Sequence, residues 1–413
     1  MTDHLVGALL IDGMGNDPVE SGVVSLSGGR VVYAGKRAGA QIGRDDQVTD
    51  VSGLTVFPGL IDCHVHHIYS RYRNLAEGER VSLEASTVRA IAHAALYLEA
   101  GYTTVRDCGT RGNIAAAIRD AIDEGIIPGP RVVASGQILS TTAGLADTNP
   151  DWVSNRYSLG KVVNGVEGLR KAVRQQVKAG VDNIKIEGSA AEASYFSYTW
   201  MSTMSVAEMR AAVNEAHRYG RTVACHAQSY EGAKNALKAG ADTVEHGTRL
   251  DEEAIALFRA GKTVLVPTLC TLYSVLELGE KLGVPAKMVS EMRANEGVWL
   301  NSLAMAREAG VTIAAGGDVG NRYAQGDNAK EIVLLSERGG LTPLEAMTAA
   351  TGNAAIALRR SNSVGALREG LFADLVVFDG NPLADLRQLL DKTRIRRVYK
   401  GGAVVAGSEA RPH

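Results

Sequence analysis

Two histidines separated by one residue, His64 and His66, follow apolar residues of strand character at positions 54–57 and 60–61. In a β-strand, residues i and i+2 point to the same face, so the two imidazoles project in one direction. Neutral imidazole is a good ligand for zinc and other borderline metals. The pair alone is equally compatible with two surface histidines near a turn, and other parts of the chain must decide between these interpretations.

Length and composition limit the class of protein. The 413 residues suffice for a large barrel with an accessory domain, and a hydrophobic content of 45% with 22% charged residues is typical of soluble globular proteins. The net charge of −2, without a long basic run, argues against binding to nucleic acid or to an anionic membrane surface. We find no signal-peptide pattern and no apolar window long enough to span a membrane, so we expect a cytoplasmic protein.

The two ends of the chain have a similar pattern of short strands joined by glycine-rich turns. Strands are predicted at 6–11, 22–26, 30–34, 370–379, 395–400 and 403–406. This pattern predicts one small β-sandwich domain built from both termini, residues 1–57 plus 364–413.

The centre, residues 58–363, alternates apolar strands with amphipathic helices that often end in Ala-Gly. Strands are predicted at 60–66, 103–107, 131–135, 182–187, 222–226, 243–246, 263–267 and 312–318. Such alternation favours an α/β fold, specifically a (β/α)8 TIM-like barrel. The alternative, a doubly wound open sheet, usually has a glycine-rich phosphate loop after its first strand, and none occurs here.

Polar residues stand at the predicted carboxyl ends of these strands, where such barrels carry out their chemistry. They are His64 and His66 on strand one, Lys185 on strand four, His226 on strand five, His246 on strand six and Asp318 on strand eight. Each has an ordinary interpretation by itself: Lys185 in an ion pair, a histidine in the core, Asp318 as a turn cap. The pattern over five strands indicates one site instead.

Four motifs carry a resemblance to a known family. They are FPGLIDCHVH at 57–66, AGADTVEHG at 239–247, LTPLEAMTAATGN at 341–353 and ADLVVFDGNPL at 373–383. With them the chain resembles the amidohydrolase superfamily over nearly its whole length. Within that superfamily it is most similar to the branch of imidazolonepropionase-like hydrolases, metal-dependent Xaa-Pro dipeptidases and ochratoxinase-like amidases.

The resemblance implies a site with two divalent metal ions, with zinc as the expected metal. His64, His66 and Asp318 would hold the first ion, and His226 and His246 the second. Lys185 would carry a carbamate that bridges both ions, which would turn an awkward buried cation into an anionic ligand. A mononuclear site with an unmodified Lys185 stays open.

The implied reaction is hydrolysis of an amide-type C–N bond by metal-activated hydroxide. Two ions about 3.5–4 Å apart can share a water molecule and lower its pKa. Asp318 would act as general base and then as the acid that protonates the leaving nitrogen. Tyr230 lies four residues after His226, in a loop whose tyrosine contacts the substrate in related dipeptidases. It is also compatible with a tyrosine on the rim.

The substrate class follows less directly. An N-acyl amino acid, a dipeptide, or an aryl amide or carbamate would suit the site, as a small-molecule partner. Related dipeptidases usually have a histidine where Leu145 stands and another before a glycine where Gln325 stands. We interpret both changes as altered substrate contacts that favour a more apolar substrate. Residues 193–201, rich in aromatic side chains, would form a wall or lid, or pack against the rim or a neighbouring subunit.

Three other functions are open. One is an Xaa-Pro dipeptidase proper, and a second is a catalytically inactive barrel used as a binding module, although inactive members lose ligands. The third is a cyclic deaminase or imidazolone-type ring hydrolase, which usually lacks the strand-four lysine, so Lys185 argues against it. By analogy, large barrels of this kind often assemble into homo-oligomers.

Overall fold

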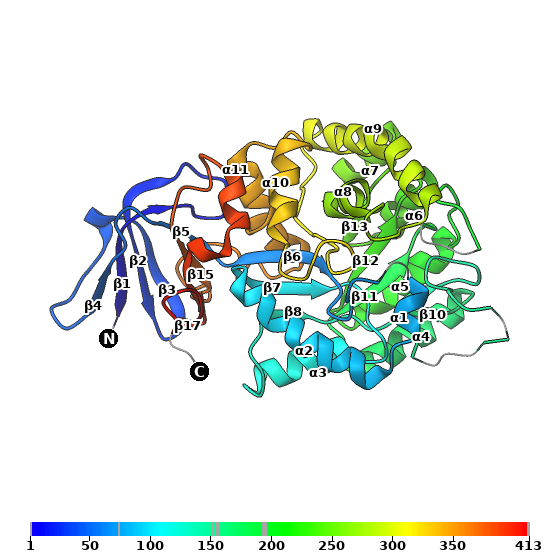
Figure 1. Cartoon of the computed structure of the whole chain (residues 1–413), viewed down its shortest axis with the longest axis horizontal. Helices are drawn as coiled ribbons and strands as arrows, with labels where there is room; N and C mark the ends of the chain where they lie inside the picture. The colour runs from blue at the N-terminus through cyan, green and yellow to red at the C-terminus, as the bar shows by residue number, and fades with distance from the viewer. Residues whose placement is uncertain (1, 73–74, 151, 154–156, 192–195, 411–413) are drawn as a thin grey trace.

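The computed structural model describes residues 2–72, 75–150, 152–153, 157–191 and 196–410. Both ends of the chain contribute strands to one sheet, in the order β17-β16-β15-β5-β1-β2-β3 with β4 paired to β1. Its strands are β1 (Asp3–Leu10), β2 (Val19–Ser27), β3 (Arg30–Lys36), β4 (Gln47–Asp50), β5 (Thr55–Pro58), β15 (Leu375–Phe378), β16 (Ile395–Lys400) and β17 (Ala403–Ala406). In Figure 1 these strands form one end of the molecule, near both termini.

Strand β5 joins the two halves of this sheet, because it pairs in parallel with β1 and antiparallel with β15. The far edge curls back: the backbone N–H of Val31 donates to the carbonyl of Leu371 over 2.9 Å, and that of Ala373 to the carbonyl of Gly29 over 2.9 Å. A separate apolar core fills the curl, with buried residues from both termini such as Leu5 and Leu375. The sequence pattern of alternating inward residues therefore produces a sheet with its own core.

The remaining strands are parallel and form two further sheets, β6-β7-β8 and β10-β9-β11-β12-β13-β14. They are β6 (Leu60–Val65), β7 (Tyr102–Asp107), β8 (Arg131–Val133), β9 (Ile138–Ser140), β10 (Gly160–Val162), β11 (Asn183–Glu187), β12 (Thr222–Ala227), β13 (Thr243–His246) and β14 (Val264–Val266). Parallel strands require crossover connections, and helices supply most of them (Figure 1).

Residues 312–318, predicted as the eighth strand, form only one isolated bridge, between Ile313 and Leu265 of β14. The ladder does not continue because the segment holds Gly316 and Gly317 and ends at Asp318, whose φ of 48° lies in the left-handed region. The segment nevertheless bonds to β6 on its other side: Cys63 N–H donates to the Ala315 carbonyl over 3.0 Å, and Asp318 N–H to the His64 carbonyl over 2.7 Å. It therefore lies between β14 and β6.

The helices surround these strands. They are α1 (Leu75–Glu79), α2 (Leu83–Glu99), α3 (Ile114–Asp123), α4 (Val166–Lys178), α5 (Val206–Arg218), α6 (Tyr230–Ala239), α7 (Glu252–Ala260), α8 (Leu269–Leu278), α9 (Ala286–Glu308), α10 (Ala329–Glu337), α11 (Pro343–Ala349) and α12 (Gly352–Ala357). Short 3₁₀ helices lie at Arg37–Gly39, Leu386–Leu390 and Lys392–Arg394. Helix α4 buries Leu169, Val173 and Gln176 at helical spacing, and Gly180 follows it with a φ of 88°.

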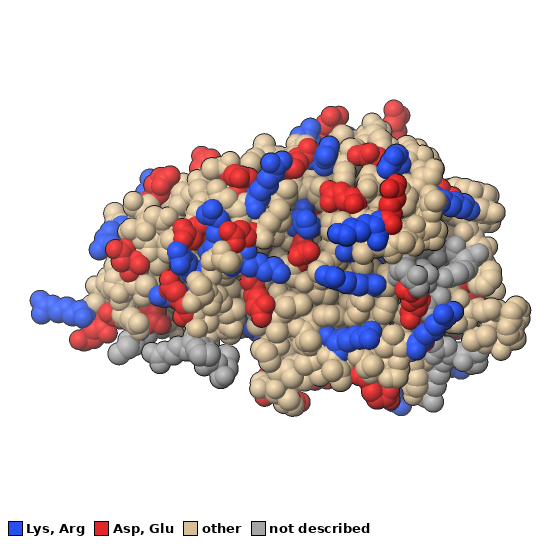
Figure 2. All heavy atoms as spheres, in the orientation of Figure 1, with Lys and Arg blue, Asp and Glu red and all other residues tan. Residues whose placement is uncertain are grey.

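The outer surface is polar and mixed in charge. On the face that Figure 2 shows, acidic and basic side chains alternate without a large patch of one sign. Among the described helices, none is both long enough and apolar enough to cross a membrane.

An ion pair between the buried carboxylate of Asp374 and the partly exposed side chain of Arg131 connects the sheet of the two termini to the central strands. Arg131, the first residue of β8, donates from Nε to Asp374 Oδ2 over 2.8 Å and from Nη2 to Asp374 Oδ1 over 3.1 Å. The Gly401 backbone N–H donates to Asp374 Oδ1 over 2.6 Å, and the Phe372 ring lies 4.0 Å from the Arg131 guanidinium carbon. A planar guanidinium on a buried carboxylate is the stronger kind of ion pair, so this contact stabilises the junction.

We expect Asp374→Asn to lower the free energy of unfolding by about 1–3 kcal/mol, because the new NH₂ group must face a donor inside the protein and the charge pair with Arg131 is lost. Chemical denaturation measures this change. Glu337→Gln is the matched control, since it removes an ion pair with Arg387 whose side chains are 38% and 66% exposed and should change stability by about 0–1 kcal/mol. Equal effects of the two substitutions would contradict a special role for Asp374.

Candidate active site

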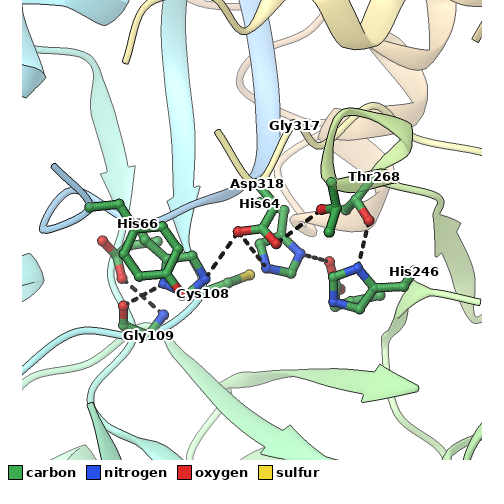
Figure 3. Close-up of polar contacts among 12 residues, drawn as sticks. His64, His66, Cys108, Gly109, His246, Thr268, Gly317 and Asp318 are labelled. Carbon is green, nitrogen blue, oxygen red and sulfur yellow. Dashed lines mark hydrogen bonds and ion pairs between the residues drawn. The ribbon is translucent and has the colours of Figure 1, made fainter. Parts of the chain in front are cut away.

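The structure brings all six predicted ligand residues to one cavity of about 100 Å³. His64 comes from β6 and His66 directly follows it, while Lys185 comes from β11, His226 from β12, His246 from β13 and Asp318 from the end of the 312–318 segment. Figure 3 shows His64, His66, His246 and Asp318 converging on the same space. The carboxyl ends of neighbouring parallel strands meet at one edge, so residues far apart in sequence become neighbours.

The distances within this group suit metal binding. Asp318 Oδ1 lies 3.5 Å from His66 Nε2 and 4.0 Å from His64 Nε2. His64, His246 and Asp318 each offer one ligand atom, and these atoms lie within 4.8 Å of one another. The His226 and His246 rings are 4.5 Å apart between centroids. A cation placed among these side chains would reach several of them at once.

Each histidine has a hydrogen bond at one of its two ring nitrogens. His66 Nδ1 bonds to the Gly109 carbonyl over 2.7 Å, His64 Nδ1 to Glu245 Oε2 over 2.8 Å, His246 Nδ1 to Thr268 Oγ1 over 2.6 Å and His226 Nε2 to the Ala190 carbonyl over 3.4 Å. A carbonyl or carboxylate accepts a hydrogen bond only from a protonated nitrogen, so the opposite ring nitrogen of neutral His64, His66 and His226 keeps its lone pair. The Thr268 hydroxyl can donate to His246 or accept from it. Such partners orient metal-binding histidines.

The partner of His64, Glu245, belongs to a buried ion pair that the sequence patterns did not identify as part of the site. Arg106 on β7 donates from Nη2 to Glu245 Oε1 over 2.7 Å. The same guanidinium donates from Nε to the Cys63 carbonyl over 2.7 Å and from Nη1 to Thr243 Oγ1 over 3.0 Å. An arginine inside a predicted apolar strand, and an acid directly before His246, were the available sequence signals.

Three residues at strand ends have left-handed backbone conformations although they are not glycines. The φ angles are 69° for His246, 51° for Thr268 and 48° for Asp318. Such conformations cost of order 1–3 kcal/mol for a residue with a side chain, and they persist where the surrounding structure enforces them. Here they occur at two of the proposed ligands and at the threonine that holds His246.

The donor set fits a divalent metal. Among the described residues, Lys185 Nζ and Asp318 Oδ1 are buried polar atoms that have no hydrogen-bond partner. Burial, helped by the charge of Lys185, lowers the pKa of His226 to about 3, and burial lowers the pKa values of His64 and His246 well below their ordinary value. These imidazoles are therefore neutral, which is the form that binds metals.

Tyr230, interpreted as a substrate contact or a rim tyrosine, and Gln325, which stands where related dipeptidases have a histidine, both lie outside the cavity lining. Tyr230 is the first residue of α6, 45% exposed, and Gln228 rather than Tyr230 lines the cavity. Gln325 is buried outside the cavity lining: its Nε2 donates to the carbonyls of His66 over 2.9 Å and Tyr69 over 3.1 Å, and its Oε1 accepts from the Tyr97 hydroxyl over 2.7 Å. Gln325 thus holds the backbone that carries His66.

Leu145 does line the cavity, as its place in the motif predicts. Other lining residues were not predicted, and they include Tyr69, Ile138, Leu159, Thr271, Met288, Met292, Asn321 and Arg322. Thr271 Oγ1 donates to Asp318 Oδ2 over 3.1 Å, and Arg322 Nε donates to Ser274 Oγ over 3.0 Å. The cavity therefore has a polar side and an apolar side.

The predicted aromatic segment borders a second cavity of about 490 Å³, which shares Ala191 with the first. Phe196, Tyr198 and Trp200 line it and are largely exposed. Residues 193–195 of that segment lie outside the described residues. The aromatic side chains that are described line this neighbouring cavity and not the one that holds the histidine cluster.

Comparison with known proteins agrees with this geometry. The amidohydrolase family profile matches residues 55–405. Ochratoxinase from Aspergillus niger is 31% identical over 98% of this chain and 86% of its own length, and its crystal structure superposes with a TM-score of 0.87 over 99% of this chain and 96% of that chain.

A crystal structure of a prolidase complexed with N-methylphosphonate-L-proline is 31% identical, with a TM-score of 0.89 over 98% of this chain and 99% of that chain. Imidazolonepropionase from Rhizobium meliloti is 26% identical over 94% of this chain and 92% of its own length. These relatives belong to the branches of the superfamily that the sequence motifs indicated. The chain belongs to the amidohydrolase family and is a hydrolase that acts on C–N bonds.

Proposed function

We propose that the protein hydrolyses an amide-type C–N bond with a binuclear metal centre. The observation that carries this proposal is the convergence of His64, His66, Lys185, His226, His246 and Asp318 on one cavity. No serine or cysteine nucleophile is required, and the cysteines that the structure describes are buried. Burial raises the pKa of the Cys108 and Cys225 thiols, Cys108 to about 12, which disfavours the reactive thiolate.

The proposal includes a (β/α)8 barrel over residues 58–363 and a β-sandwich domain over residues 1–57 plus 364–413. The hydrogen bonds of residues 312–318 to both β14 and β6 support a closed ring of strands, as does the parallel bridge between Ser135 and Asn183. The separate apolar core of the terminal sheet supports its status as a domain.

We assign His64, His66 and Asp318 to the first metal ion and His226 and His246 to the second, with a carbamate on Lys185 shared between them. Zinc is the proposed metal, because imidazole nitrogens and carboxylate oxygens are its usual ligands in hydrolases. The ions would supply Lewis-acid activation of a water molecule and of the scissile carbonyl.

Asp318 is the proposed proton carrier. Its Oδ2 accepts from Thr271 over 3.1 Å, while Oδ1 faces the histidine cluster without a hydrogen-bond partner among the described residues. Oδ1 would take a proton from the attacking water and give it to the leaving nitrogen, so that amide and water yield a carboxylic acid and an amine. Tyr230, exposed at the start of α6, would contact only a substrate that reaches the rim.

The cavity favours an N-acyl amino acid or a dipeptide-like amide. Arg322 supplies a cationic side chain to the polar side, which would attract a substrate carboxylate. Leu145 and Met292 belong to the apolar side. The ochratoxinase and prolidase relatives support this class, whereas Leu145 in place of the histidine usual in dipeptidases argues against an Xaa-Pro dipeptidase proper.

A substrate screen tests the proposed function. The metal content of purified protein is measured first, and the metal-loaded protein is then assayed with N-acyl amino acids, Xaa-Pro dipeptides, aryl amides and carbamates. We expect about two metal ions per chain and turnover of N-acyl amino acids. Metal-loaded protein that hydrolyses no C–N bond in this panel would instead support a binding module.

We expect Lys185→Ala to abolish activity and to lower the metal content, because the shared ligand is lost. Metal analysis and kinetic assays on the same preparation measure both effects. A variant that kept full activity and both ions would show that Lys185 does not bridge them.

We expect Asp318→Asn to lower kcat by about 10²-fold or more, because the amide cannot take up the proton. Circular dichroism should show an unchanged fold, and metal analysis a largely unchanged metal content. An unchanged kcat would exclude Asp318 as the base.

We expect Gln325→Leu to weaken metal binding by about 10–100-fold, because the His66 backbone loses its donor. Competition with a chelator measures the affinity. Gln137→Leu is the matched control, since Gln137 Nε2 also bonds to two carbonyls, Ser158 over 2.7 Å and Gly160 over 3.3 Å, on a loop without a proposed ligand. Altered KM with unchanged metal affinity would favour a substrate contact instead.

A further inference from the structure

A buried carboxylate, Glu187, lies at the end of β11 two residues after Lys185 and therefore on the same face of the strand. It accepts hydrogen bonds from five donors. They are Ser140 Oγ (2.6 Å), Thr141 N (2.7 Å), Thr141 Oγ1 (2.6 Å), Leu145 N (2.5 Å) and Thr203 Oγ1 (2.9 Å). The proposed reaction gives Glu187 no part in proton transfer or metal binding. The five hydrogen bonds to its carboxylate therefore need another explanation.

Most of these donors belong to the loop at residues 140–146, which follows β9. The loop wraps closely around the carboxylate: a Cβ atom at Gly144 would lie 2.1 Å from Glu187 Oε1, so only glycine fits there. Ala143 has a left-handed φ of 62°, and the Gly144 N–H donates to the Thr141 carbonyl over 2.9 Å. The conformation of the loop is therefore formed around Glu187.

The loop determines where Leu145 lies. Its backbone N–H is bound by Glu187, and its side chain lines the cavity that holds the histidine cluster. Four further apolar side chains line the same cavity, namely Ile138, Leu159, Met288 and Met292. Leu145 is thus one of the apolar side chains that line this cavity, whose lining also includes Arg322.

We propose that Glu187 is a positioning residue for substrate selectivity: it binds the 140–146 loop so that Leu145 completes an apolar subsite for an aliphatic or aromatic group of the amide substrate. This inference rests on the proposed function and adds the class of group that the substrate carries beside the scissile bond. An apolar group gains from leaving water in such a subsite, and each methylene of fit changes selectivity by about 10-fold or more.

Glu187→Gln is a sharp test because it conserves shape. Thr141 N–H bonds to Oε1 and Leu145 N–H bonds to Oε2, so each carboxylate oxygen faces a backbone donor. A glutamine amide must turn its NH₂ group toward one of them in either orientation. Hydroxyl donors can rotate away, but a backbone N–H cannot, so the loop must move.

The first measurement does not depend on activity. Amide hydrogen exchange in peptides that cover residues 139–147 of the full-length protein should be faster in Glu187→Gln than in the wild type. Thr203→Val is the matched control, since it removes one donor to Glu187 without changing the loop, and its exchange should resemble the wild type. Unchanged exchange in Glu187→Gln would overturn the positioning role, whether or not the protein is an amidase.

The second measurement uses N-acyl amino acids with acetyl, butanoyl and hexanoyl groups on a common amino acid. We expect Leu145→Ala and Glu187→Gln each to lower the hexanoyl-to-acetyl ratio of kcat/KM by about 10-fold, mainly through KM. The double variant should resemble Leu145→Ala, because both changes act through one side chain. Metal content should stay at the wild-type value.

Other outcomes contradict the proposal in distinguishable ways. A uniform loss for all acyl groups in Glu187→Gln would place Glu187 with Lys185 and the metal ligands rather than with the subsite. Additive effects in the double variant would separate Glu187 from Leu145. Absence of wild-type turnover on every amide would refute the proposed function and the subsite with it, while the exchange result would still decide whether Glu187 positions the loop.

Discussion

The buried ion pair between Arg106 and Glu245 is the interaction on which the site depends. The guanidinium links three strands: it starts on β7, bonds to the Cys63 carbonyl of β6 and contacts Thr243 and Glu245 of β13. Glu245 then uses its second oxygen to orient His64. Removing either partner would leave an uncompensated charge in the interior. Hence the pair that holds the strands together also determines which nitrogen of His64 faces the cavity.

The departures from regular structure are concentrated at the same place. The segment at 312–318 fails to form a regular strand because Gly316 and Gly317 pack closely against neighbouring strands and Asp318 adopts a left-handed backbone. A side chain at Gly316 would bring its Cβ to 2.5 Å from Val266 and 2.9 Å from His64. A continuous ladder would have kept the regular alternation of side chains, whereas the left-handed turn places Asp318 among the histidines. The irregular backbone at 312–318 is therefore explained by the position that Asp318 takes in the site.

The sequence allowed the repeating features to be predicted, because these depend on near neighbours. The hairpin at Gly401 and Gly402 has two glycines with positive φ, and helix α5 begins with a capping box at Ser205 and Glu208. The six candidate ligands followed from strand ends and from the resemblance. Arg106 with Glu245, and Gln325 with His66, could not be predicted, since they are contacts over 139 and 259 residues of sequence. The change to Gln325 was interpreted as an altered substrate contact, whereas its side chain packs against Gly320, where a Cβ atom would lie 2.3 Å from Gln325 Nε2.

In the proposed function, different residues of the cavity serve the reaction and the choice of substrate. The proposed metal ligands come from strand ends, where backbone hydrogen bonds to neighbouring strands allow little change. Part of the cavity's apolar lining comes from the loop at 140–146, which supplies Leu145, and from α9, which supplies Met288 and Met292. A substitution at Leu145 changes only the shape of this lining, whereas one at Glu187 changes the loop that carries Leu145 and also removes a charge two residues from Lys185. Substitutions at Leu145 can therefore change substrate selectivity alone. Glu187 is more constrained, because a change there affects both the loop and the surroundings of Lys185.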